Sequence, residues 1–237
     1  MIENQSLKLF LISKFNKNID EITDEEFNSL DSIAISGLDV LYHEDKIDFE
    51  LIVKLFPNLK SITISSYDLS DKDIEILSRL NLEEVNFNDC LFNELNVKLN
   101  IFDSLKSLSF VNCVSSDYSY LECDFENLIR LHVINPKDEV QLDIDSINAL
   151  NLNELFLDSC IVTNLDRITK FSKCESLMIL WTYITSEEVE KLYELSALKK
   201  LYISEEYIDE EQKNKFTTNN VMVRHNLNDF VVDVDEE

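Results

Sequence analysis

The chain has 237 residues, of which 47 are acidic and 21 are lysine or arginine, so its formal net charge at pH 7 is −26. A charge of this size repels phosphate backbones and anionic lipid surfaces, and we therefore expect no direct binding to nucleic acid or to a membrane. Two interpretations of the charge stay open. It either solubilises a solvated convex side or steers a basic partner toward the protein.

The sequence shows no targeting signal. Residues 1–15 contain scattered lysines and no uninterrupted apolar core of the length that a signal peptide needs. No stretch reaches the roughly 18 apolar residues of a membrane span. We therefore expect a cytoplasmic protein.

Residues 1–29 are predicted to form an N-terminal helical cap. Residues 7–15 are amphipathic, and a second helix is expected to begin after Thr23, whose hydroxyl suits the N-cap position. A cap of this kind covers the apolar edge that any stacked array exposes at its end.

Residues 30–216 repeat one apolar skeleton eight times. Each copy has a large apolar residue, two variable residues, an apolar residue, one variable, another apolar, two variable, and a small or polar residue. The copies begin 22 to 29 residues apart, at Leu30, Leu59, Leu82, Leu105, Leu128, Leu152, Cys174 and Leu198. A period of this length predicts a solenoid and excludes a helical bundle or a doubly wound sheet.

Each repeat is expected to contribute one short strand. The fourth and sixth motif positions point inward, and the fifth and seventh lie on the concave face. The fold class is therefore α/β, a curved right-handed solenoid with a parallel concave sheet and mixed helical and irregular convex returns. Capped apolar spacing predicts helices in the returns at 43–56, 69–77 and 184–192 and from residue 208.

Residues 217–237 are predicted to close the array. Thr218, Val221, Val223 and Asn226 match a degenerate ninth copy, which would add a final strand to the sheet. Residues 229–237 form an acidic tail, which we expect to be ordered only if its apolar residues 230–232 dock.

The skeleton resembles the leucine-rich-repeat family over about residues 27–226. The opening helices resemble the cap of many bacterial leucine-rich-repeat proteins, including internalin-like ones. The resemblance implies a bacterial protein that binds partners through the variable strand positions. Internalins are secreted and often wall-anchored, and the lack of an export signal or anchor in this sequence is a departure from them.

Four of the five cysteines occupy motif positions that point into the core, namely Cys90, Cys113, Cys160 and Cys174. Neighbouring strands lie about 4.8 Å apart, so a disulfide between Cys90 and Cys113 is geometrically conceivable. Reduced, buried thiols are the favoured state, since one cysteine is left over. The acidic neighbours of Cys123 raise a thiol pKa and argue against a reactive role.

The concave face is predicted to change character along the array. The fifth motif position reads Ala34, Thr63, Asn86, Ser109, His132, Phe156, Met178 and Tyr202. Side chains at one position on successive strands lie in contact, so the later repeats should form one exposed apolar patch. The predicted partner-binding residues are Val111, Arg130, His132, Ile134, Phe156, Met178, Leu180, Trp181 and Tyr202. The charged rim of the patch is expected to be Arg130, Glu154, Asp158, Lys200 and Glu205.

Two alternatives to an exposed patch stay open. The C-terminal tail of the chain could cover these residues, or the motif register could slip by one position and place them in the core. Aromatic residues are the commonest hot spots of protein interfaces, and this supports the interpretation as a binding patch.

The sequence offers no credible active site. Its three histidines lie on different repeats or returns, without ligands at metal or triad spacing, and a single glycine cannot build a phosphate loop. We expect a non-enzymatic protein-protein interaction module without metal or cofactor. The alternative is an acidic inhibitor or immunity protein that neutralises a basic nuclease or toxin. A pure scaffold is not distinguished from these, and the oligomeric state is left open.

Overall fold

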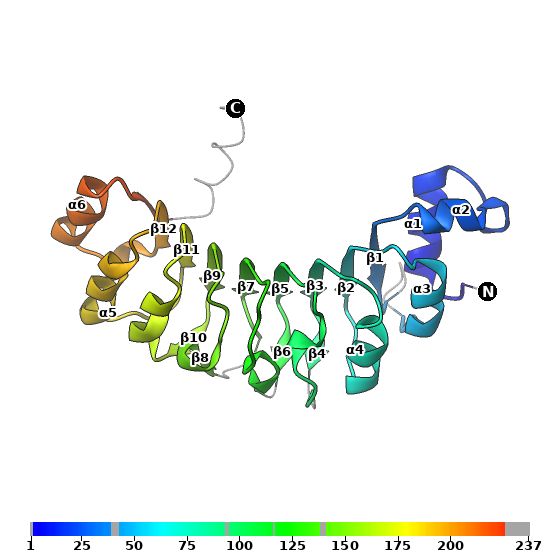
Figure 1. Cartoon of the computed structure of the whole chain (residues 1–237), viewed down its shortest axis with the longest axis horizontal. Coiled ribbons are helices and arrows are strands. Elements are labelled where there is room, and N and C mark those ends of the chain that lie inside the picture. The colour runs from blue at the N-terminus through cyan, green and yellow to red at the C-terminus, as the bar shows by residue number, and fades with distance from the viewer. Residues whose placement is uncertain (1, 39–42, 93–94, 116, 138–140, 226–237) are drawn as a thin grey trace.

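The computed structural model describes residues 2–38, 43–92, 95–115, 117–137 and 141–225. Over these residues the chain forms an arched solenoid, with one sheet along its concave side and helices and turns along its convex side (Figure 1). The repeat period predicted this architecture. The predicted acidic tail, residues 229–237, lies outside the described residues.

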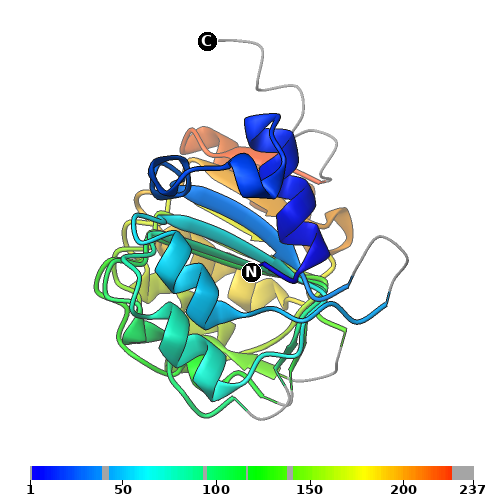
Figure 2. The same ribbon diagram turned by 90° about the vertical axis from the view of Figure 1, so that its right-hand side faces the viewer.

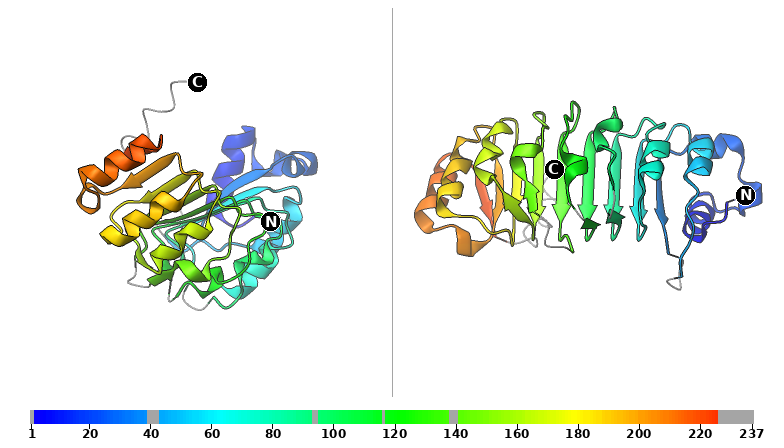
Figure 3. Two further views of the ribbon diagram at one scale, coloured as in Figure 1. Left: turned by 60° about the vertical axis from the view of Figure 1, so that its left-hand side comes forward. Right: turned by 90° about the horizontal axis from the view of Figure 1, so that it is seen from below.

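The sheet has nine strands in chain order, and every neighbouring pair is parallel. Its strands are β1 (Ser32–Ser36), β2 (Ser61–Ser65), β3 (Glu84–Asn88), β5 (Ser107–Val111), β7 (Arg130–Ile134), β9 (Glu154–Asp158), β11 (Ser176–Ile179), β12 (Lys200–Ile203) and β13 (Met222–Arg224). The row of strands is seen from below in the right-hand view of Figure 3. Strand β13 lies within the segment that matches the degenerate ninth copy of the motif.

The register stacks equal motif positions of successive repeats. Ile62 of β2 pairs with Val85 of β3, and Leu108 of β5 pairs with Leu131 of β7. All four side chains are fully buried. One repeat has no second layer of its own, so its apolar side chains are buried by the repeats on either side.

A tight turn at the eighth motif position follows six strands of the sheet, from β2 to β11. The backbone there is left-handed, with φ between 49° and 57° in six repeats, at Ser66, Asp89, Asn112, Asn135, Ser159 and Trp181. Short polar residues tolerate this conformation better than bulky ones. In the first repeat the position is Gly37, where a Cβ would collide with the carbonyl oxygen of Ser66.

The ninth motif position links successive repeats by hydrogen bonds. The thiol of Cys90 donates to the Ile64 carbonyl at 3.3 Å, and the Thr182 hydroxyl donates to the Leu157 carbonyl at 2.9 Å. The thiols of Cys113 and Cys160 do the same to Phe87 and Val133 at 3.4 and 3.2 Å. All five cysteines are free thiols, as the sequence favoured.

Burial suppresses the acidity of two further thiols. It raises the pKa of Cys174 to about 12, and the thiol lies within the core. Burial, and then the nearby Asp124 carboxylate, also raises the pKa of the half-buried Cys123. Neither thiol therefore has the thiolate character that reactivity requires.

The convex returns combine helices, 3-10 turns and short strands. The α-helices are α3 (Phe49–Leu55), α4 (Asp71–Leu77), α5 (Ser186–Lys191) and α6 (Glu210–Thr218). The 3-10 turns are η2 (Leu99–Ile101), η3 (Ser119–Leu121), η4 (Ile144–Ser146), η5 (Leu165–Lys170), η6 (Leu192–Glu194) and η7 (Glu205–Tyr207). The short strands β4 (Leu91–Phe92) and β6 (Val114–Ser115) pair with each other, as do β8 (Gln141–Asp143) and β10 (Ile161–Thr163). Helices α4, α5 and α6 begin at capping boxes, as their sequences predicted.

The first return is less helical than predicted. A helix was expected over residues 43–56, but α3 begins only at Phe49, where the Asp48 carboxylate accepts a hydrogen bond from the Leu51 amide at 3.0 Å. Upstream, Glu44 forms an isolated bridge with Leu38, so the chain there is extended. The N-cap residue Asp48 thus determines where the helix begins, although the spacing of the apolar residues predicted an earlier start.

Three short elements precede the first strand: α1 (Gln5–Phe15), η1 (Ile19–Glu21) and α2 (Asp24–Asn28). Helix α1 packs on β1 at the N-terminal end of the solenoid (Figure 2). The Asn4 side-chain amide donates to the Ser36 carbonyl at 2.8 Å, so the helix is tied to the edge strand.

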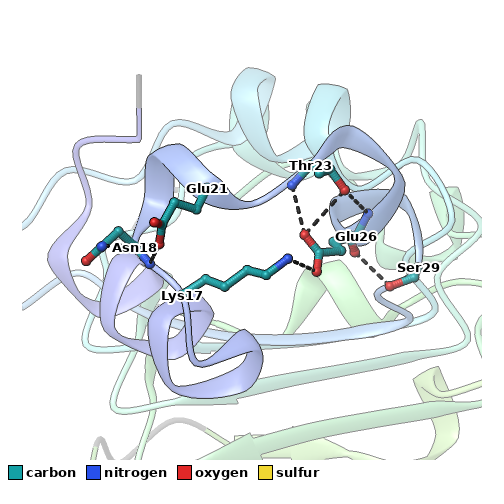
Figure 4. Close-up of polar contacts among 6 residues, drawn as sticks. All are labelled: Lys17, Asn18, Glu21, Thr23, Glu26 and Ser29. Carbon is teal, nitrogen blue, oxygen red and sulfur yellow. Dashed lines mark hydrogen bonds and ion pairs between the residues drawn. The ribbon is translucent and has the colours of Figure 1, made fainter.

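Polar contacts brace this region (Figure 4). Thr23 and Glu26 form a capping box, in which each side chain accepts a hydrogen bond from the other residue's backbone amide, at 3.3 and 3.0 Å. The Lys17 ammonium lies 2.6 Å from the Glu26 carboxylate and holds the pKa of that carboxyl below its usual value. The role predicted for Thr23 is confirmed.

Replacing Leu131 with alanine should lower the free energy of unfolding by about 2–5 kcal/mol, because the side chain is fully buried and its removal leaves a cavity. Urea unfolding followed by circular dichroism measures the change. Leu150→Ala is the matched control, since Leu150 is 55% exposed. Equal losses in both variants would contradict the assignment of the core.

The native protein should react with a thiol reagent such as DTNB at no more than Cys123, because the other four thiols are buried. Unfolding in urea should expose all five cysteines to the reagent. Rapid modification of two or more thiols in the native protein would show that the core is open.

Candidate functional site

The candidate binding face is the concave surface of β5, β7, β9, β11 and β12. The strand register places His132 beside Phe156, Phe156 beside Met178, and Met178 beside Tyr202. At the seventh position Val111 lies beside Ile134. The predicted column is therefore contiguous across the strands.

The predicted exposure of four of these residues is wrong. Phe156, Met178, Leu180 and Tyr202 are only 5%, 2%, 1% and 1% exposed, and they form an apolar cluster separate from the main core. The rings of Phe156 and Tyr202 meet edge to face, with 6.4 Å between centroids. Large side chains on strands about 4.8 Å apart shield one another, which a motif position by itself does not reveal.

The accessible part of the predicted site lies around this cluster. Arg130 is exposed, and Val111, His132 and Ile134 are half-buried. Trp181 is 67% exposed. These residues present both charge and apolar area to solvent.

His132 is held in a defined orientation. Its ring stacks on Phe156 with 4.4 Å between centroids and an interplanar angle of 10°. Its Nε2 atom lies 2.6 Å from the Glu154 carboxylate. The imidazole therefore extends the apolar cluster and bridges it to a charged group of the rim.

One of the predicted rim charges is misplaced. Asp158 is only 7% exposed, and burial raises the pKa of its carboxyl, although Ser159 donates a hydrogen bond to it at 3.3 Å. In the sheet it pairs with Ile134 of β7, another seventh-position residue. Arg130, Lys200 and Glu205 are exposed, as the sequence predicted.

The concave face of the first repeats carries small or polar side chains. Ala34 is exposed, and Thr63 and Asn86 are half-buried. The Asn86 amide donates to the Glu84 carboxylate at 2.8 Å. The two halves of the face thus differ in residue type, although the exposure predicted for the later half is wrong for four residues.

Trp181 lies at the edge of the face rather than on a strand. It occupies the left-handed turn after β11, with φ of 52°. Two exposed apolar residues near this edge escaped the sequence analysis, Tyr183 at 73% and Ile161 at 44% exposure. Both follow a buried ninth-position residue, and this place in the motif was the signal that could have identified them.

The described residues contain no group of three or more His, Cys, Asp or Glu side chains that could hold a metal ion. In the same part of the chain, no helix has both the length and the apolar character needed to cross a membrane.

Asp158→Asn should stabilise the protein more at pH 7 than at pH 3. A raised carboxyl pKa means that the folded state keeps this proton to higher pH than the unfolded state does, so ionisation costs stability as the pH rises. The neutral amide removes that cost. Urea midpoints at both pH values measure the gain, and Asp103→Asn, at an exposed carboxylate, should show no such difference.

Comparison with known proteins identifies the fold. No protein-family model matches the chain, and no curated protein matches its sequence. Internalin C2 from Listeria monocytogenes is similar in structure, with a TM-score of 0.63 and 15% identity over 94% of this chain and 93% of that chain. Internalin F from the same species has a TM-score of 0.44 and 14% identity, over 93% of this chain and 94% of that chain.

A protein from Bacteroides fragilis has a TM-score of 0.48 and 14% identity, over 90% of this chain and 71% of that chain. At such identities a likeness concerns the fold alone. The match to internalin C2 extends over nearly the whole length of both chains, and it agrees with the nine-stranded parallel sheet built from one repeated motif. This chain therefore has the leucine-rich-repeat fold.

Proposed function

We propose that the chain is a non-enzymatic protein-interaction module that binds a protein partner through the concave face of its C-terminal half. The observation that carries the proposal is the change along this face, from small polar side chains on β1 to β3 to aromatic and aliphatic ones on β7 to β12. The first repeats bury their core side chains although their concave residues are small or polar. The large side chains of the later repeats therefore support a role in recognition.

In this proposal the accessible residues contact the partner directly. They are Arg130, Val111, His132, Ile134 and Trp181. The buried cluster of Phe156, Met178, Leu180 and Tyr202 acts as the rigid base on which they rest. A rigid base lowers the conformational entropy that binding costs, because the contacting side chains lose less freedom.

The second candidate is an acidic inhibitor or immunity protein that neutralises a basic nuclease or toxin. The net charge of −26 favours it, because such a field accelerates association with a basic partner. The two candidates differ in salt dependence. A strong fall of the association rate with added salt supports the inhibitor, and a weak one supports the general module.

Two sequence-based expectations belong to the same proposal. One is a cytoplasmic location, which fractionation of the native cells tests. Independence from a metal or cofactor follows from the scattered histidines, and partner binding in EDTA tests it.

Partner capture from a native lysate tests the binding face. Arg130→Ala combined with Ile134→Ala removes one exposed charge and one half-buried apolar group, and it should abolish capture of the partner. Thr63→Ala combined with Asn88→Ala is the matched control on β2 and β3 of the same face, and it should leave capture intact. Proteins identified by mass spectrometry in the wild-type and control samples, but absent with the first variant, are the expected partner.

Circular dichroism must show both variants folded, since a lost partner means nothing for an unfolded array. Equal capture by the two double variants would contradict the assignment to the C-terminal half. Loss of capture in the control alone would place the partner on the first repeats instead.

A further inference from the structure

Four apolar residues follow β9, β11 and β12, the strands labelled near the C-terminal end of the solenoid in Figure 1, and form a partly exposed surface there. It consists of Ile161, Trp181, Tyr183 and Tyr207, which we call the edge patch. Ile161, Trp181 and Tyr183 are 44%, 67% and 73% exposed, and Tyr207 is half-buried. This surface is separate from the concave cluster, whose residues are buried.

The edge patch spans three neighbouring repeats. Ile161, Tyr183 and Tyr207 occupy the same motif position, one residue after the ninth. Their repeats are neighbours in the sheet, where strands lie about 4.8 Å apart. The rings of Tyr183 and Tyr207 are in edge-to-face contact, with 5.9 Å between centroids and an interplanar angle of 81°.

Hydrogen bonds fix the backbone that presents the two most exposed rings. The Trp181 amide donates to the Ser204 hydroxyl at 2.7 Å. Thr182, which lies between the rings and is fully buried, donates to the Leu157 carbonyl at 2.9 Å and accepts from the Cys160 amide at 3.2 Å. The rings are therefore displayed from a rigid turn, which lowers the entropic cost of binding to them.

Neither packing nor backbone preference accounts for a tryptophan at this turn. Five other repeats place Ser, Asp or Asn in the same left-handed conformation, which is unfavourable for a bulky residue. With two thirds of its surface exposed, Trp181 gains little from burial. A recognition role explains both its exposure and its conformation.

Two carboxylates accompany the edge patch. Glu205 and Glu206 open η7, directly after Ser204, the residue that bonds to the Trp181 amide. Both are exposed, and within the described chain no ion pair or side-chain hydrogen bond occupies either one. The repeat next to that of Trp181 thus carries two carboxylates that form no ion pair with a described lysine or arginine.

We propose that the edge patch binds an arginine side chain presented by the protein partner. Its planar guanidinium would stack on the Trp181 or Tyr183 ring, and its N–H groups would donate to Glu205 or Glu206. Arginine suits this surface better than lysine, because it combines ring stacking with a fork of donors and is more weakly hydrated. The inference rests on the proposed function, since it assumes a protein partner, and it adds the chemistry of one contact.

The test uses the full chain and a labelled probe peptide in which arginine alternates with glycine. Fluorescence anisotropy at about 0.15 M salt, where long-range attraction is screened, should show saturable binding. Glu205→Gln combined with Glu206→Gln should weaken it roughly three- to tenfold. Glu210→Gln combined with Glu211→Gln removes the same charge from the exposed start of α6, and it should leave the affinity unchanged.

Trp181→Asn separates recognition from folding. Asparagine already occupies this turn in two other repeats, at Asn112 and Asn135, so the variant should fold with an unchanged or higher urea midpoint. It should nevertheless lose most of the peptide affinity. Because Trp181 is the only tryptophan in the chain, its fluorescence in the wild type should also change on peptide addition.

Several results would overturn the proposal. These are no saturable binding of the arginine peptide, equal weakening in the α6 control, or full affinity in Trp181→Asn. Binding of cellohexaose that Trp181→Asn removes, without binding of the peptide, would identify a carbohydrate platform instead.

Partner capture distinguishes this inference from the proposed function. Capture that is lost in Arg130→Ala with Ile134→Ala but retained in Trp181→Asn would overturn the edge contact alone. Capture that is lost in Trp181→Asn but retained in the concave variant would overturn the concave assignment and leave the edge patch in place.

Discussion

Each repeat of this chain can bury its apolar side chains only against the repeats on either side. From this constraint follow the parallel sheet, the stacked columns of side chains and the strict motif spacing. The left-handed turns that follow six of the strands and the hydrogen bonds from the ninth motif position, such as those of Cys90 and Thr182, keep successive repeats in step. Equal motif positions of successive repeats consequently lie side by side on the surface. Substituting a residue at one of these positions therefore also changes the surroundings of its neighbours in the adjacent repeats.

The fold was predictable because burial in a solenoid follows the period of the sequence. Leu131 and its equivalents lie where the motif places them. Exposure on the concave face was less predictable. The burial of Tyr202 and Asp158 depends on the size of side chains in neighbouring repeats, and no single repeat encodes it. The start of α3 was missed because one cap, Asp48, outweighed an apolar pattern that extends further upstream.

The C-terminal half therefore has two surfaces with different physical character. The concave cluster is buried and stiff, and its accessible margin combines Arg130 with half-buried apolar groups. The edge patch is exposed and aromatic, and Glu205 and Glu206 lie next to it. In a partner that contacts both surfaces, the contact with the edge patch would fix its orientation. The contact with the concave face would bury most of the interface area. Shape and charge would then act together in selecting the partner, as specific recognition requires.

The packing of α1 on β1 has a consequence for self-association. A parallel sheet that simply ended at β1 would offer a row of open backbone groups, on which a strand from another molecule could template itself. Here the helix lies over that end, and the Asn4 amide occupies the Ser36 carbonyl. At this end of the array an added strand would therefore have to displace α1 and compete with Asn4 for the Ser36 carbonyl.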